Sequence, residues 1–167
     1  MSRQFIAAAR VLIITMMPGL LVIVLAAVSA CSDGPDNPEQ RVRNMINAGE
    51  EAVEARSIIG VLDFISDNYQ DKDGRQKQEI KQLIAGYILR NKSIHLLTRV
   101  QHVALNDDET RADVILYVGM AGVPVASVDQ LVFTRADLYR FDLSLVLEDG
   151  DWRVARGDWH PARLDDF

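Results

Sequence analysis

Residues 143–154 read LSLVLEDGDWRV, and this stretch decides the fold of the chain. Leucine occupies every second position up to residues 148–151, EDGD, a polar sequence that is typical of a tight β-hairpin turn. Alternating apolar side chains continue on both sides of this turn. The pattern therefore predicts two antiparallel strands, at residues 139–148 and 152–159, which pair through one short hairpin.

Two further strands are expected upstream of this hairpin. Residues 94–105 and 112–120 both alternate, and the polar turn NDDE at 106–109 separates them. The second of these strands is apolar on both faces, which indicates that other elements cover much of it. Residues 121–136 have no clear period, and a loop that includes an irregular strand is expected there.

The N-terminal part of the domain has helical rather than alternating periodicity. Helices are expected at residues 39–56, 57–69 and 75–91. The first helix places its apolar side on Val42, Met45, Ile46, Gly49 and Val53. Helices followed by an antiparallel meander define an α+β domain, here three N-terminal helices packed on a strongly curved antiparallel sheet. This domain is expected at residues 39–160, with 161–167 as a C-terminal tail.

Several segments together resemble the nuclear transport factor 2-like (NTF2-like) superfamily, which includes cystatin-like cone folds. They are EEAVEAR at 50–56, FISDNY at 64–69, Tyr87 on the third helix, and the hairpin at 143–154. The likeness covers roughly residues 40–160 and rests on the order of these patterns. It implies a cone of three helices against a strongly bent sheet, with a cavity at the open end. Similar cones serve as isomerases, dehydratases, hydrolases, ligand binders and assembly modules, so function must be argued from the site.

The N-terminus has the marks of a bacterial lipoprotein signal. A positively charged start and an apolar run at residues 11–30 precede VSAC at 28–31, which resembles a lipobox. The resemblance implies cleavage before Cys31 and attachment of diacylglycerol and further acyl chains, such as palmitate, to that residue. Acyl chains contribute about 0.8 kcal/mol per buried methylene, so several chains make a stable anchor. Residues 1–30 are thus the expected signal-peptide helix, and 31–38 the lipidated tether.

The location of the domain follows from this segment. The apolar run also has the length of a transmembrane helix, about 30 Å, so an uncleaved anchor is the alternative. In both cases residues 32–167 are expected in the cell envelope, facing the periplasm. Ser32 favours the outer membrane over the inner one, because aspartate directly after the cysteine is the usual retention signal of lipoproteins and Asp33 lies one place later.

Composition narrows the classes of partner. Without residues 1–30 the chain carries 16 basic and 24 acidic residues, a formal net charge of −8. This balance, without a clustered basic face, argues against nucleic acid as a partner. Cys31 is the single cysteine, so neither an intrachain disulfide nor a cysteine zinc site can form. The sequence contains no glycine-rich phosphate loop and no HExxH motif, and nothing in it calls for a metal or a cofactor.

An enzyme on such a fold needs a carboxylate whose pKa an apolar cone raises, with hydroxyl groups nearby. Asp113 and Asp142 are candidate bases because each lies on a strand among apolar residues, and Tyr117 is the candidate hydroxyl. The alternative is that both aspartates face solvent on the outer face of the sheet, paired with Arg140 or Arg111.

Three aromatic residues, Tyr87, Tyr139 and Trp159, are expected to line the cavity. Two functions stay open at this point. The favoured one is a non-catalytic, membrane-anchored module whose domain binds a partner protein or a small apolar ligand. The other is a small-molecule isomerase or hydrolase that uses a carboxylate of the cone as general base. Apolar residues on the second and third strands also leave open a homodimer through the sheet.

Overall fold

The computed structural model describes residues 37–167, and the expected signal peptide and Cys31 lie outside the described residues. In chain order the elements are α1 (Pro38–Glu54), α2 (Ile58–Leu62), α3 (Lys77–Arg90), β1 (His95–Leu105), β2 (Arg111–Ala121), α4 (Val128–Thr134), β3 (Asp137–Glu148), β4 (Asp151–Pro161) and the 3-10 turn η2 (Leu164–Asp166). None of the helices within residues 37–167 combines the length and the hydropathy that crossing a membrane would require. The expected α+β class with an antiparallel sheet is confirmed.

The four strands form one antiparallel meander in the order β1-β2-β3-β4. The hairpin between β3 and β4 turns at Asp149 and Gly150, whose φ angles are 52° and 89°. Two successive positive φ angles define the turn type that matches the twist of paired strands, and Asp-Gly adopts it at low cost. Leu145, only 2% exposed, lies before this turn at the centre of the core.

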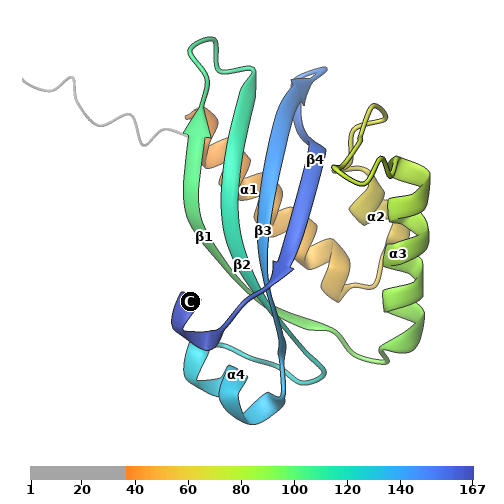
Figure 1. Cartoon of the computed structure of the whole chain (residues 1–167), viewed down its shortest axis with the longest axis vertical. Coiled ribbons are helices and arrows are strands. Elements are labelled where there is room, and N and C mark those ends of the chain that lie inside the picture. The colour runs from red at the N-terminus through yellow and green to blue at the C-terminus, as the bar shows by residue number, and fades with distance from the viewer. Residues whose placement is uncertain (1–36) are drawn as a thin grey trace, which may run out of the picture. The chain divides into compact units, whose positions relative to one another are not determined.

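The sheet bends around the helices (Figure 1). Register shifts interrupt the β1–β2 pairing between Val100 and His102 and the β3–β4 pairing between Ser144 and Leu145. An extra residue in one strand increases local bending and twist. The concave face therefore closes over α1 instead of remaining flat.

Helix α1 packs against the concave face of the sheet, and local sequence sets the residue at which it begins. The Asn37 side chain accepts a hydrogen bond from the Glu39 backbone N–H at 2.9 Å, and Pro38 occupies the first helical position. The helix thus begins inside the expected tether at 31–38. Val42, which is fully buried, and Ile46 face the sheet at helical spacing.

The second helix is shorter than the sequence predicted, because α2 ends at Leu62. Beyond it the chain pairs with the edge of β4. The Ser66 N–H donates to the Val154 carbonyl at 3.0 Å, and the Val154 N–H donates to the Phe64 carbonyl at 2.8 Å. This pairing satisfies backbone groups of a buried segment, and tertiary contact overrides the helical period that extended the prediction over residues 57–69.

Residues 121–136 contain α4 where the sequence predicted a loop with an irregular strand. The helix packs on the outer face of the sheet at Gly119, where a Cβ would lie 2.6 Å from Leu131 Cδ2. Any larger residue at position 119 would have to displace the buried Leu131 side chain. On the same face the Phe167 ring lies 5.7 Å from the Tyr117 ring. The expected homodimer through the sheet stays a prediction. Such a dimer would have to accommodate α4 and Phe167 on the outer face.

Candidate functional site

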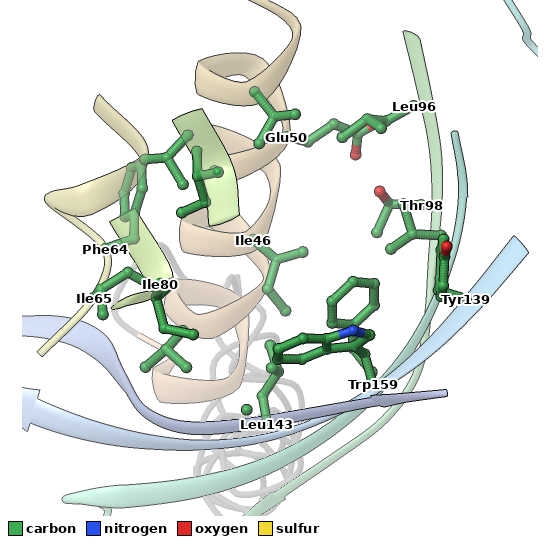
Figure 2. Close-up of a pocket in the computed structure, with 18 of the residues that line it drawn as sticks. Ile46, Glu50, Phe64, Ile65, Ile80, Leu96, Thr98, Tyr139, Leu143 and Trp159 are labelled. Carbon is green, nitrogen blue, oxygen red and sulfur yellow. The ribbon is translucent and has the colours of Figure 1, made fainter. Parts of the chain in front are cut away.

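A cavity of about 460 Å³ lies between the helices and the concave face of the sheet (Figure 2). Helix α1, residues 61–69 and α3 form one wall, and all four strands contribute to the other. Aliphatic and aromatic side chains dominate the lining, and Tyr87, Tyr139 and Trp159 all lie in it. An apolar cavity of this size with few polar groups is typical of a small-molecule site.

Glu50 carries the one carboxylate among the described residues that line this cavity. Its side chain on α1 and that of Thr98 on β1 reach toward each other across the space (Figure 2). Burial raises the pKa of Glu50 above its ordinary value of 4.5, and the like charges of Glu54 and Glu51 raise it further, while the interaction with Thr98 partly offsets both. The net effect is a carboxylate that holds its proton more tightly than one in water.

Sequence analysis did not single out Glu50 as a site residue, although a signal for it exists. Glu50 lies four positions after Ile46 and three before Val53, which places it on the apolar side of α1. An ionisable residue inside an apolar helical stripe points into the core or into a cavity. Glu50 was not singled out because Glu51 and Glu54 follow it closely, and the three residues together look like one acidic, solvent-exposed segment.

Glu50 leads to a first prediction, on stability. Because its folded-state pKa is raised, the ionised form costs stability, and this cost appears as the pH rises above the ordinary value of 4.5. Glu50→Gln should therefore raise the unfolding free energy of the ligand-free protein at neutral pH by a few tenths of a kcal/mol, a small gain because the side chain is only half-buried. The gain should vanish below pH 4 or so, where the wild-type carboxyl is protonated in both states.

Urea unfolding at a series of pH values measures this effect. The matched control is Glu51→Gln, which removes the same charge from the exposed side of α1 and should show a smaller gain, because it relieves only the repulsion between Glu51 and Glu50. A Glu50→Gln variant that is less stable than the wild type at neutral pH would contradict the assigned environment.

Trp159 is held at the cavity by a polar network beneath it. The Arg75 guanidinium lies 4.6 Å from the centre of the Trp159 ring, a cation–π arrangement. Arg75 in turn pairs with the buried carboxylate of Asp71 at 2.6 Å and with the exposed carboxylate of Asp73 at 2.7 Å. The Asp71 carboxylate also accepts hydrogen bonds from the backbone N–H groups of residues 73 and 75. The network therefore fixes one aromatic wall of the cavity.

The same network leads to a second prediction, on the stability of the protein at acid pH. Burial alone would raise the pKa of Asp71, but the hydrogen bonds and charge of Arg75 outweigh it and hold the pKa below the ordinary value of 3.8. The stabilisation is therefore fully present above 3.8 and is lost as the pH falls through the lower folded-state pKa. Asp71→Asn should lower the melting temperature at neutral pH by several degrees. It should also make the decrease in melting temperature at acid pH smaller than in the wild type.

Thermal unfolding followed by circular dichroism between pH 7 and pH 2 tests this behaviour. Asp73→Asn is the control, because its carboxylate is exposed and contacts the same arginine. Equal pH profiles for the wild type and Asp71→Asn would contradict the role given to Asp71.

Two tyrosines of the lining, Tyr69 and Tyr87, have raised pKa values. Burial first of all raises the pKa of Tyr69 to about 12, and its hydroxyl donates to the Gly157 carbonyl at 3.1 Å. Burial, and then the negative charge of Asp137, also raises the pKa of Tyr87. Both side chains therefore stay protonated well above neutral pH.

The three catalytic candidates from sequence do not reach the cavity. Asp113 is exposed and accepts a hydrogen bond from the Ser144 hydroxyl at 2.9 Å, on the outer face of the sheet. Asp142 pairs with Arg140 on that face at 2.6 Å, which is the alternative considered for it. Tyr117 is buried there against the C-terminal residue.

The physical reason is the strict alternation of each strand. Leu116 and Val118 on β2, and Phe141 and Leu143 on β3, point into the cavity, so the residues between them point away. A general base of the cone would therefore have to be Glu50. Within residues 37–167 no set of His, Cys, Asp and Glu side chains gathers in an arrangement that would hold a metal ion.

Comparison with known proteins identifies the fold. No protein-family model and no curated protein matches the sequence. A proposed dehydratase of the NTF2-like family from Streptomyces avermitilis has a TM-score of 0.60 at 15% identity, over 77% of this chain and 99% of its own. A ketosteroid isomerase-like protein from Erwinia carotovora atroseptica has a TM-score of 0.55 at 12% identity, over 77% and 98%.

The name of a third similar structure indicates a different role. It is a proposed association domain of a calcium/calmodulin-dependent protein kinase type II from Thiobacillus denitrificans, with a TM-score of 0.57 at 11% identity over 72% of this chain and 94% of its own. At these identities the likeness extends to the fold alone. The described residues thus have the NTF2-like cone fold, and their function depends on their own cavity.

Proposed function

We propose that this protein is a membrane-anchored lipoprotein of the cell envelope whose NTF2-like domain binds a small apolar ligand in the cone. One observation carries the binding part: a cavity of about 460 Å³ with an almost wholly apolar lining and a single carboxylate. Apolar surface of this kind gains free energy when a ligand displaces water from it, at about 25 cal/mol per Å². A partner protein is a weaker fit, because the lining lies inside the cone and not on an outer face.

A binding assay with a neutral dye tests the cavity. The compact unit Pro35–Phe167 contains every residue of the hydrophobic core and is suited to it, since the lipid anchor would otherwise take up the dye. Nile red should bind with one saturable site, and n-decanol should displace it. Fluorescence that rises linearly with protein, without saturation or displacement, would count against the proposal.

The anchor is proposed from the sequence of residues 11–31, with its apolar run and the terminal VSAC. The domain would then face the periplasm, and Ser32 favours delivery to the outer membrane. Mass spectrometry of the mature N-terminus is the test. A diacylated or triacylated Cys31 is expected, whereas an unmodified Cys31 or a retained Met1 would remove the lipoprotein assignment.

A second function, proton transfer on a small hydrophobic substrate, is supported by the position of Glu50. Its raised pKa in an apolar cavity is the environment that a general base requires, and Tyr87 and Tyr139 supply hydroxyls in the same lining. Exchange of deuterium from solvent into the α-positions of 2-decanone would reveal such activity. Catalysis by the wild type and none by Glu50→Gln is the outcome that supports it, and equal rates with and without protein would exclude it for this substrate class.

A further inference from the structure

The Glu50 carboxylate in the lining of the cavity has no positive group acting on it, and this bears on the charge of the ligand. Within residues 37–167 the ion pairs of the structure do not include Glu50. The charged groups that act on it are Glu51 and Glu54, both negative. Arg90 also borders the cavity, but it is exposed at the end of α3 and is not among the groups that act on Glu50. The carboxylate therefore has a hydrogen-bonding neighbour, Thr98, but no countercharge.

Aromatic side chains gather in the same space. Trp159 projects toward the centre of the cavity, and Tyr139 lies beside it on the sheet wall (Figure 2). The Arg75 guanidinium, which Asp71 and Asp73 hold in place, lies 4.6 Å from the centre of the Trp159 ring. Electron-rich ring faces and a carboxylate are the groups that recognise an ammonium.

From this arrangement we propose that the preferred ligand is an apolar amine, whose ammonium group pairs with Glu50 while its hydrocarbon part fills the cone. The inference rests on the proposed binding function and adds the charge of the ligand to it. An ammonium supplies the missing countercharge and donates to the carboxylate. An anionic ligand of the same shape would meet the Glu50 carboxylate, which already feels the negative charges of Glu51 and Glu54, and would be disfavoured.

Three ligands with one hydrocarbon chain test the proposal: n-decylamine, n-decanol and n-decanoate, titrated calorimetrically into the unit Pro35–Phe167 at neutral pH. Decylamine should bind about tenfold more tightly than decanol, the ratio expected for one charge-assisted hydrogen bond. Decanoate should bind more weakly than decanol. Glu50→Gln should remove the preference for the amine and leave decanol binding in place, and Glu51→Gln is the matched control that should retain the preference.

The outcomes separate the two claims. Equal affinity for amine and alcohol, or a preference that survives in Glu50→Gln, overturns the inference and leaves the apolar binding function standing. Failure of all three ligands to bind overturns both. If Glu50→Gln does not fold, the ratio of amine to alcohol affinity in the wild type still decides, because a ratio near one overturns the inference.

Discussion

Gly49→Trp should reduce the affinity of the cavity for Nile red by about a hundredfold or more, without loss of folding. Gly49 lies on α1 within the lining, and a Cβ built on it meets its nearest neighbour, Phe64 Cδ2, at an ordinary 3.8 Å. A Cβ at this position is therefore accommodated, and the rest of a large side chain extends into the cavity. Replacing glycine in a helix interior gains about 0.5–1 kcal/mol for alanine and a smaller amount for tryptophan, so the helix propensity of α1 does not oppose the substitution.

Gly49→Ala is the matched control for this prediction. It gains at least as much helix propensity but adds only one methyl group to the lining, so Nile red should bind within about twofold of the wild type. The pair separates occupation of the cavity from any change in α1 itself. A folded Gly49→Trp variant that binds the dye as well as Gly49→Ala does would show that the dye binds elsewhere.

Leu145→Ala is expected to have the largest effect on stability. Leu145 is 2% exposed at the centre of the sheet, and removal of a buried leucine side chain costs about 2–5 kcal/mol through lost burial and the cavity left behind. That cost is a large part of the roughly 5–15 kcal/mol that holds a domain folded. Equilibrium unfolding in urea measures it as a lower midpoint at an unchanged slope.

The neighbouring residue provides the control. Val146 points to the outer face of the same strand and is only partly buried, so Val146→Ala should cost less than half as much. Equal losses for the two substitutions would contradict the assignment of inner and outer faces along β3.

Local chemistry explains which elements could be predicted from the sequence. The hairpin of β3 and β4 depends on alternating leucines and an Asp-Gly turn, both of which act over a few residues. The shortened α2 and the whole of α4 depend on distant contacts instead. The first ends where the chain pairs with β4, and the second packs where Gly119 leaves room for Leu131.

The candidate site was predicted only in its aromatic part. Tyr87, Tyr139 and Trp159 lie on inward-facing positions of their elements, and they line the cavity. For Asp113 and Asp142 an apolar neighbourhood in sequence did not imply an apolar environment, because successive residues of a strand face opposite sides. The carboxylate that does reach the cavity, that of Glu50, is on a helix, whose period of 3.6 residues aligns it with the apolar stripe.

Methyl-resolved NMR of the unit Pro35–Phe167 titrated with n-decanol is the measurement that tests the central claim most directly. The account predicts saturable shifts of the methyl groups of Leu116, Val118 and Met120, which face the cavity, and no comparable shifts at Val146 on the outer face. Shifts confined to exposed apolar residues such as Val132 on α4, with none at Leu116 and Val118, would contradict it.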